Sequence, residues 1–510
     1  MRGPHNLFRL IRIAATFQRT GALKVTLNTV QSHPNIKIAV RFLGIPFSIL
    51  GLRGDPRLPP IARALTALGP AYIKFGQVLS TRPDIVGKKL ASELKFLLDS
   101  LPPFPTEVVQ KTIEEELNIK VDDKFTDFSG AIATASIAQV HKARLKYTGQ
   151  DVAVKVRRPN IENDFKKDID AFYLVADLIR RLSPASRRLR PRAVVAHFES
   201  VVNREIDFRL EASAADEFAA TTSKDSGIYI PSVKWEYSSK QILVMEWADG
   251  ISLNDIEKLR KSGHDLKEIA NRLIQLFLNH ALRDGFFHAD LHQGNLKVDS
   301  NGDLIFLDFG IMGRINSYTR KVYAEIIYGF INQDYHRVAE VHFEAGYVPP
   351  DKNVDDFAQA LRAVGAPILD MDASHISMAN LLNHLFEVTE RFGMETRTEL
   401  ILLQRTMVVV EGVARSLYPK INMWTASKPI VENYIREHLG PKAILKDTVT
   451  AIKLLSKLPP QLPEILNNLT KNEVIDPPPQ ETKNLTRSFV FFCLGAGFML
   501  ILAILYGVFL

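Results

Sequence analysis

The sequence has a single cysteine, Cys493, among its 510 residues. One cysteine excludes a disulfide framework and a cysteine-rich zinc site. It suits a reducing compartment without requiring one. Acidic residues are missing from the start of the chain: no Asp or Glu occurs before Asp55, although eight Lys and Arg lie in that stretch. Most of the formal net charge of +7 is therefore placed at one end of the chain.

This acid-free segment has a helical pattern. Leu7, Leu10, Ile11 and Ala14 recur at the spacing of one helix face. A basic amphipathic helix suits an anionic membrane surface, an Arg-rich start is also typical of a mitochondrial transit peptide, and an ordinary surface helix is the alternative. Aromatic and basic residues do not alternate as a nucleic-acid stacking platform requires, so no nucleic acid is expected as a partner.

A long apolar run is confined to the end of the chain. Residues 489–510 carry no charge, and 22 helical residues extend over roughly 33 Å, enough to cross a hydrocarbon core. The run predicts a transmembrane helix, with a buried core helix as the alternative. Lys483 and Arg487 precede it, which places the preceding domain on the cytoplasmic side of a bacterial inner membrane, or on the matrix side in a mitochondrion.

The segment FFHADLHQGNLKVDSNGDLIFLDFG at 286–310 contains the most informative pattern. Asp290 and Asn295 are five apart in a loop, and Asp308 precedes Phe-Gly, which is the order of a kinase catalytic loop followed by D-F-G. Phosphoryl transfer needs a carboxylate that orients the acceptor, and a carboxylate and an amide oxygen that hold Mg²⁺. We assign these roles to Asp290, Asp308 and Asn295. The alternatives are a metal site built from the two His and two Asp, and a plain turn.

Two further elements fit a site for ATP. The apolar strand VAVKV contains Lys155, which a kinase would place on the α- and β-phosphates, paired with a glutamate on a neighbouring helix. Glu211 is the candidate, on a long helix predicted over 191–222. The strand QILVMEW ends near Glu246 and Ala248, whose backbone we expect to contact adenine.

Four motifs together resemble the UbiB family of atypical kinase-like proteins over roughly residues 60–430. KFGQ at 74–77 is similar to the K-x-G-Q motif of that family, EIDFRLEA at 205–212 to its E-x-D motif, and HADLHQGN to its catalytic loop. Where kinases have G-x-G-x-x-G, this chain has an alanine-rich loop. The matching positions are Lys74 and Gln77, Glu205 and Asp207, and the loop residues Ala133, Thr134, Ala135 and Ser136.

The resemblance implies an α+β, two-lobed atypical protein-kinase-like fold that binds ATP and Mg²⁺ and supports ubiquinone biosynthesis. Its expected partners are membrane lipid, quinone-type intermediates and other ubiquinone biosynthesis proteins. Together with an N-terminal helical extension and a C-terminal transmembrane helix, this fold gives six expected parts. They are a basic membrane-associating segment at 1–59, a helical extension with KFGQ at 60–120, a kinase-like N-lobe at 121–250, a mostly helical, kinase-like C-lobe at 251–474, a linker at 475–488 and a transmembrane helix at 489–510.

The sequence departs from the pattern at two loop positions. Gln293 stands where the family has proline, and His292 stands where typical kinases have a phosphate-contacting lysine. Residues 311–330 contain no A-P-E motif and no long activation segment, which disfavours a protein kinase. A nucleotide-binding scaffold without turnover is the other alternative. Finally, we expect the KFGQ helix to cover the cleft, with Lys74 facing Glu205 or Asp207.

Overall fold

The computed structural model describes residues 5–29, 51–80, 102–182, 191–369 and 398–438, and a few isolated positions at 90–97, 384–394 and 440. The chain divides into two compact units. The first contains the described residues up to Leu210 together with Lys234–Trp247, and the second contains Glu211–Val233 and the described residues from Ala248 onward.

The first unit contains an antiparallel sheet. Its order is β1-β3-β4-β6, with β2 paired to β3. Val152, Val154 and Val156 are fully buried on one face of β4 and pack with Val109 and Ile113 of α8. Because side chains alternate along a strand, Lys155 lies on the other face. The elements are α8 (Thr106–Leu117), α9 (Val121–Lys124), β1 (Phe125–Thr126), β2 (Ala131–Thr134), β3 (Ala138–Leu145), β4 (Asp151–Arg157), η3 (Trp235–Tyr237) and β6 (Ile242–Glu246).

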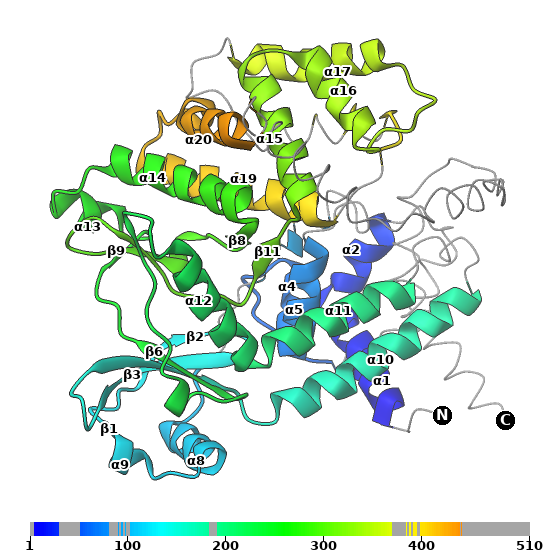
Figure 1. Ribbon diagram of the computed structural model, residues 1–510. Helices are drawn as coiled ribbons and strands as arrows, with labels where there is room; N and C mark the ends of the chain where they lie inside the picture. The colour runs from blue at the N-terminus through cyan, green and yellow to red at the C-terminus, as the bar shows by residue number, and fades with distance from the viewer. Residues whose placement is uncertain are drawn as a thin grey trace, which may run out of the picture. The chain divides into compact units, whose positions relative to one another are not determined.

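A group of helices completes the first unit (Figure 1). Aromatic side chains join three of them: Phe75 stacks on Phe172 with ring centroids 4.8 Å apart and meets Phe198 edge-on at 5.1 Å. Gly76 allows close packing here, because a Cβ at this position would overlap the side chains of Leu65 and Leu97. The helices are α1 (His5–Thr20), α2 (Ala22–Thr29), α4 (Pro60–Leu68), α5 (Pro70–Ser80), α10 (Ile161–Leu182) and α11 (Pro191–Glu205).

The second unit is mostly helical and contains two small sheets. One has the order β5-β10-β9-β7 and the other pairs β8 with β11. Phe218 of α12 (Phe208–Thr222) contacts Phe286, Phe306 and Phe309, with ring centroids about 6 Å apart. The strands are β5 (Ile228–Tyr229), β7 (Ile251–Ser252), β8 (Phe286–His288), β9 (Leu296–Val298), β10 (Leu304–Phe306) and β11 (Met312–Arg314).

Helices α14, α19 and α20 pack together in this unit, and Figure 1 shows them as neighbours. A π-helical turn, η4, continues α14 and ends at Gly285 in the left-handed conformation. The chain then enters β8 directly. The remaining elements are α13 (Ile256–Lys261), α14 (Leu266–Asn279), η4 (His280–Asp284), η5 (Gln293–Asn295), α15 (Ser317–Ile331), α16 (Tyr335–Glu344), α17 (Val354–Leu369), α19 (Thr398–Leu417) and α20 (Met423–His438).

Two structural predictions need correction. The long helix expected over 191–222 is two helices, because α11 ends at Glu205 and α12 begins at Phe208. The fold class also loses its C-terminal transmembrane helix: within the described ranges, no helix has the length and the apolar character needed to cross a membrane. The predicted span at 489–510 and the linker at 475–488 lie outside the described residues.

Candidate active site

The loop between β8 and β9 carries the predicted catalytic residues. Asp290 follows β8 by two positions, and Asn295 ends the short helix η5. The side-chain nitrogen of Asn295 donates a hydrogen bond to the backbone oxygen of Asp290 over 3.1 Å. This bond leaves the side-chain oxygen of Asn295 as an acceptor and fixes its position relative to Asp290.

His288 connects this loop to the segment that contains Asp308. Its Nδ1 accepts a hydrogen bond from the backbone N–H of Asp290 at 3.1 Å, so the ring proton is on Nε2, which donates to the backbone oxygen of Asp308. Burial lowers the pKa of His288, and the ring is therefore neutral. A single buried imidazole thus holds both carboxylate-bearing segments by their backbones.

Asp308 and Asn295 have the donor atoms that a magnesium ion requires. The Asp308 carboxylate accepts a hydrogen bond from the backbone N–H of Gly310 at 2.9 Å, and the backbone N–H of Leu307 donates to the backbone oxygen of Asn295 at 3.1 Å. Carboxylate and amide oxygens are hard ligands that suit Mg²⁺. Asp308 and Asn295 therefore fit the expected Mg²⁺ site.

His292 lies on the outer side of the loop. Its side chain is 53% exposed, and its Nε2 is 3.9 Å from a carboxylate oxygen of Asp290, too far for a hydrogen bond. The Nδ1 atom accepts from the backbone N–H of Gly294 at 3.0 Å. In this structure the ring supports the turn of the loop.

Helix α19 supports the catalytic loop, a role that the sequence analysis did not predict. Thr406 donates to the backbone oxygen of Ala289 at 3.2 Å, and Gln293 donates to Ser416. Arg405 interacts electrostatically with Asp290; the surrounding protein lowers the pKa of Arg405, and Asp290 acts in the opposite direction. The available sequence signal was the polar run Gln404–Thr406 between the apolar runs at 400–403 and 407–410.

The alanine-rich loop lies at the turn between β2 and β3 in the first unit. Ala133 and Thr134 pair with Val140 and Gln139 of β3, and the backbone N–H of Ala135 donates to Ala138 at 2.8 Å. Ser136 is buried, and among the described residues its Oγ has no hydrogen-bond partner. A buried hydroxyl of this kind fits a loop that receives a polar ligand.

Lys155 and Glu211 belong to different units. Lys155 is half-buried on β4, with its Nζ 5.3 Å from the ring centroid of Phe208. Glu211 is buried on α12 in the second unit. Their pairing stays a prediction.

The predicted adenine contacts lie around the end of β6. Glu246 is the last residue of β6 and pairs with Val152. The backbone oxygen of Ala248 accepts a hydrogen bond from Lys297 at 3.0 Å. Contact between this backbone and adenine stays a prediction.

Of the four residues expected to form a gate, Lys74 and Glu205 contact each other, and Asp207 and Gln77 have other partners. Lys74 of α5 forms an ion pair with Glu205 at the end of α11, over 2.9 Å, with side chains only 14% and 10% exposed. Asp207 pairs instead with Arg209 at 2.7 Å, and that guanidinium lowers the pKa of Asp207. Gln77 donates to the backbone oxygen of Leu97 at 3.5 Å. The predicted contact of Lys74 with one of the two acids is therefore present, and its partner is Glu205.

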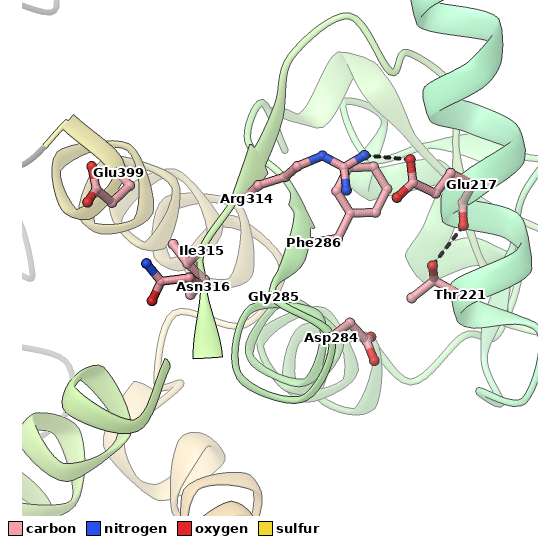
Figure 2. A pocket seen from close by; sticks show the side chains of 9 residues that line it. All are labelled: Glu217, Thr221, Asp284, Gly285, Phe286, Arg314, Ile315, Asn316 and Glu399. Atoms are coloured by element: carbon pink, nitrogen blue, oxygen red, sulfur yellow. Dashed lines mark hydrogen bonds and ion pairs between the residues drawn. The ribbon is translucent and has the colours of Figure 1, made fainter. Parts of the chain in front are cut away.

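A pocket in the second unit is lined by residues from α12, η4, β8, β11 and α19 and from the turns that follow η4 and β11 (Figure 2). It has a volume of about 580 Å³, and none of the predicted catalytic or metal residues lines it. Arg314 covers the ring of Phe286 at 4.1 Å and pairs with Glu217 of α12. These contacts fix β11 to β8 and to α12.

A charged cluster that the sequence analysis missed lies near Asp284. Asp225, His280 and Asp284 have ligand atoms within 4.8 Å of one another, a spacing that can hold a metal ion. Arg283, however, pairs with both carboxylates, at 2.7 Å each, and lowers the pKa of Asp225. Because the guanidinium already supplies the positive charge, we interpret the cluster as structural.

The fold and the catalytic loop define an atypical kinase-like protein, and the comparisons agree. Residues 96–342 match the model of the ABC1 atypical kinase-like domain, and residues 361–422 match that of the UbiB helical domain. The solved Rv3197–erythromycin complex of Mycobacterium tuberculosis covers 70% of this chain and 87% of its own, with a TM-score of 0.51 and 22% identity. At that identity the likeness shows a shared fold.

Sequence relatives identify the family. "Probable protein kinase UbiB" of Marinobacter nauticus is 36% identical over 467 residues, which cover 91% of this chain and 85% of that protein. The protein of the same name from Pseudomonas paraeruginosa is 37% identical over 438 residues, covering 85% and 82%. The chain belongs to the UbiB family of atypical kinase-like proteins.

Proposed function

We propose that this chain binds Mg-ATP and transfers or hydrolyses its γ-phosphate, in support of ubiquinone biosynthesis on or near lipid quinone intermediates. The observation that carries this proposal is the bridge through His288, which holds Asp290 and the Asp308 segment together. Phosphoryl transfer depends mainly on positioning and on charge stabilisation, and a buried neutral imidazole supplies that positioning without adding a charge.

Each polar residue has a distinct role in this scheme. Asp290 orients the attacking hydroxyl or water, and Asp308 and Asn295 hold the Mg²⁺ that neutralises the phosphate charge. Lys155 binds the α- and β-phosphates, and its pairing with Glu211 stays a prediction. The loop with Ala135 and Ser136 covers the phosphates, and the backbone around Glu246 and Ala248 receives the adenine. Arg405 was not among the predicted site residues. It is a cation near Asp290 and takes the place of the phosphate-contacting lysine that typical kinases have in this loop.

The segment after Asp308 argues for a small or lipid acceptor rather than a peptide. β11 ends at Arg314, and α15 begins at Ser317. This short connection leaves no room for the peptide-docking segment of a protein kinase. The link to ubiquinone rests on family membership, and the acceptor would be a hydroxyl of a quinone-type lipid or water.

The first test is nucleotide binding by Asp308→Asn. Without the carboxylate, Mg-ATP should no longer raise the melting temperature of the protein, because the metal site loses its anionic ligand. Asp303→Asn is the matched control: Asp303 is partly exposed between β9 and β10 and pairs with Arg272 at 3.5 Å. The control should keep the full shift. An Asp308→Asn protein with the wild-type shift would refute the assignment of the metal site.

A further inference from the structure

Helix α1 is fixed to the rest of its unit near both ends. Near its start, Arg9 forms an ion pair with Asp168 of α10. Near its end, the hydroxyl of Thr16 accepts a hydrogen bond from the backbone N–H of Leu52 at 3.1 Å. Arg19 donates to the backbone oxygen of Gly51 at 2.6 Å. The helix is therefore an integral part of the fold.

Packing at Gly51 confirms how closely α1 is held. A Cβ at Gly51 would overlap the backbone of Ala15, so only glycine fits against the helix at this point. Leu10 and Ala15 of α1 are buried, whereas Ile11 and Ala14 are only partly buried. Of the apolar face that the sequence offers to a membrane surface, Leu10 is thus covered by protein.

Asp168 is a buried junction between α1 and α5. Its carboxylate accepts a hydrogen bond from the Tyr72 hydroxyl at 3.1 Å in addition to the ion pair with Arg9, and its side chain is only 12% exposed. Burial raises the pKa of Asp168, and Arg9 acts in the opposite direction. Arg9 thus supplies a positive charge that offsets part of the cost of burying this carboxylate.

Tyr72 stands two positions before Lys74 on α5. The Tyr72 ring meets Phe172 edge-on, with centroids 5.1 Å apart, and Phe172 lies one helical turn after Asp168 on α10. Tyr72 thus contacts one face of α10 twice, because its ring packs on Phe172 and its hydroxyl donates to Asp168. A shift at Asp168 would move the start of α5 and the lysine that follows it.

We propose that Arg9 is a positioning residue for the ion pair of Lys74 and Glu205, acting through Asp168 and Tyr72. The N-terminal helix α1 then fixes the position of α5, the helix that carries the K-x-G-Q motif. The effect of this position on turnover rests on the proposed function, whereas the structural coupling does not.

The test uses charge compensation. Arg9→Ala leaves a buried carboxylate without its counter-ion, and breaking one side of a buried pair is strongly unfavourable. Arg9→Ala/Asp168→Asn removes that charge and keeps an oxygen that accepts from Tyr72. Arg9→Lys keeps the positive charge. Lys24→Ala, an exposed position on α2, is the control.

The first readout is amide hydrogen exchange of α5, with α8 of the same unit as the reference. Arg9→Ala should speed exchange in α5 at least about tenfold and leave α8 unchanged. The double variant should return α5 to within about threefold of wild type, and Arg9→Lys should lie close to wild type. Equal acceleration of α5 and α8, or a double variant no better than Arg9→Ala, would overturn the proposal.

The second readout is ATP turnover. Arg9→Ala should change kcat in the same direction as Lys74→Met, and the two together should have no more effect than Lys74→Met alone, because both act on one ion pair. Additive effects would contradict the proposal. If the wild-type protein shows no turnover at all, the proposed function fails, and the exchange experiment still decides the role of Arg9.

Discussion

Among single residues, His288 does the most to order the candidate site. Its two nitrogens are both used, one by the N–H of Asp290 and one by the oxygen of Asp308. A buried ring with both nitrogens bonded has a fixed tautomer and a fixed orientation. The distance between the two acidic segments therefore depends on the length of one imidazole, which explains why a histidine precedes the catalytic aspartate.

A second buried histidine, His342 of α16, makes stability depend on pH. Burial lowers the pKa of His342 to about 4. The unfolded chain binds the proton first as the pH falls below about 6.5. The contribution to stability is therefore complete above that pH and is lost as the pH falls towards 4. The linkage corresponds to at most about 3 kcal/mol of unfolding free energy.

His342→Leu should flatten this pH dependence. The imidazole donates to the backbone oxygen of Val338, one helical turn earlier. This oxygen is also the i−4 acceptor of the helical backbone, so leucine removes the titrating group without leaving it unsatisfied. Urea unfolding between pH 7 and 4 should show a smaller loss of stability in the variant than in wild type. His336→Gln, at an exposed histidine of the same helix, should behave like wild type. Parallel curves for His342→Leu and wild type would show that the loss has another source.

Among the elements, α5 shows why the K-x-G-Q motif contains glycine. Replacing a helical glycine by alanine gains roughly 0.5–1 kcal/mol of helix propensity. At Gly76, however, the added Cβ would overlap the side chains of Leu97 and Leu65. Overpacking of this kind costs typically 1–3 kcal/mol. The packing cost is the larger effect, so Gly76→Ala should destabilise the protein.

The matched control for this prediction is Gly412 of α19. It is exposed, and a Cβ there would meet nothing within 4 Å. Gly412→Ala should therefore stabilise the protein by roughly 0.5–1 kcal/mol, the opposite sign to Gly76→Ala. Both changes can be read from urea or thermal unfolding. Gains of equal size at both positions would show that α5 has room for a side chain and is not closely packed.

The element boundaries show where the sequence was informative. The apolar pattern of VAVKV predicted β4, and that of QILVMEW predicted β6. The break between α11 and α12 was missed, because no proline or glycine marks it. Asp207 was the available signal: its carboxylate accepts from the backbone N–H of Arg209 at 3.2 Å, the kind of local bond by which aspartate begins a helix.

For the molecule as a whole, spacing along the chain identified the residues of one loop but not their support. Asp290, Asn295 and Asp308 could be assigned because a fixed motif spaces them. The contacts from Thr406 and Arg405 depend on how α19 packs against that loop, which no local pattern encodes. The same holds for the bond from Arg9 to Asp168, since the two residues are distant in sequence.

At the scale of the whole chain, the identity of the phosphoryl acceptor most needs a test. The short connection between β11 and α15 leads us to expect ATP turnover that rises with vesicles containing a quinone-type lipid and does not rise with peptides. In a deletion strain, the wild-type gene should restore ubiquinone. Asp308→Asn should leave intermediates accumulated, whereas Asp303→Asn should complement. Peptide phosphorylation without lipid stimulation would instead make the chain a protein kinase. Nucleotide binding with no turnover under either condition, together with complementation by Asp308→Asn, would make it a scaffold, because the metal ligand would then be dispensable for its function.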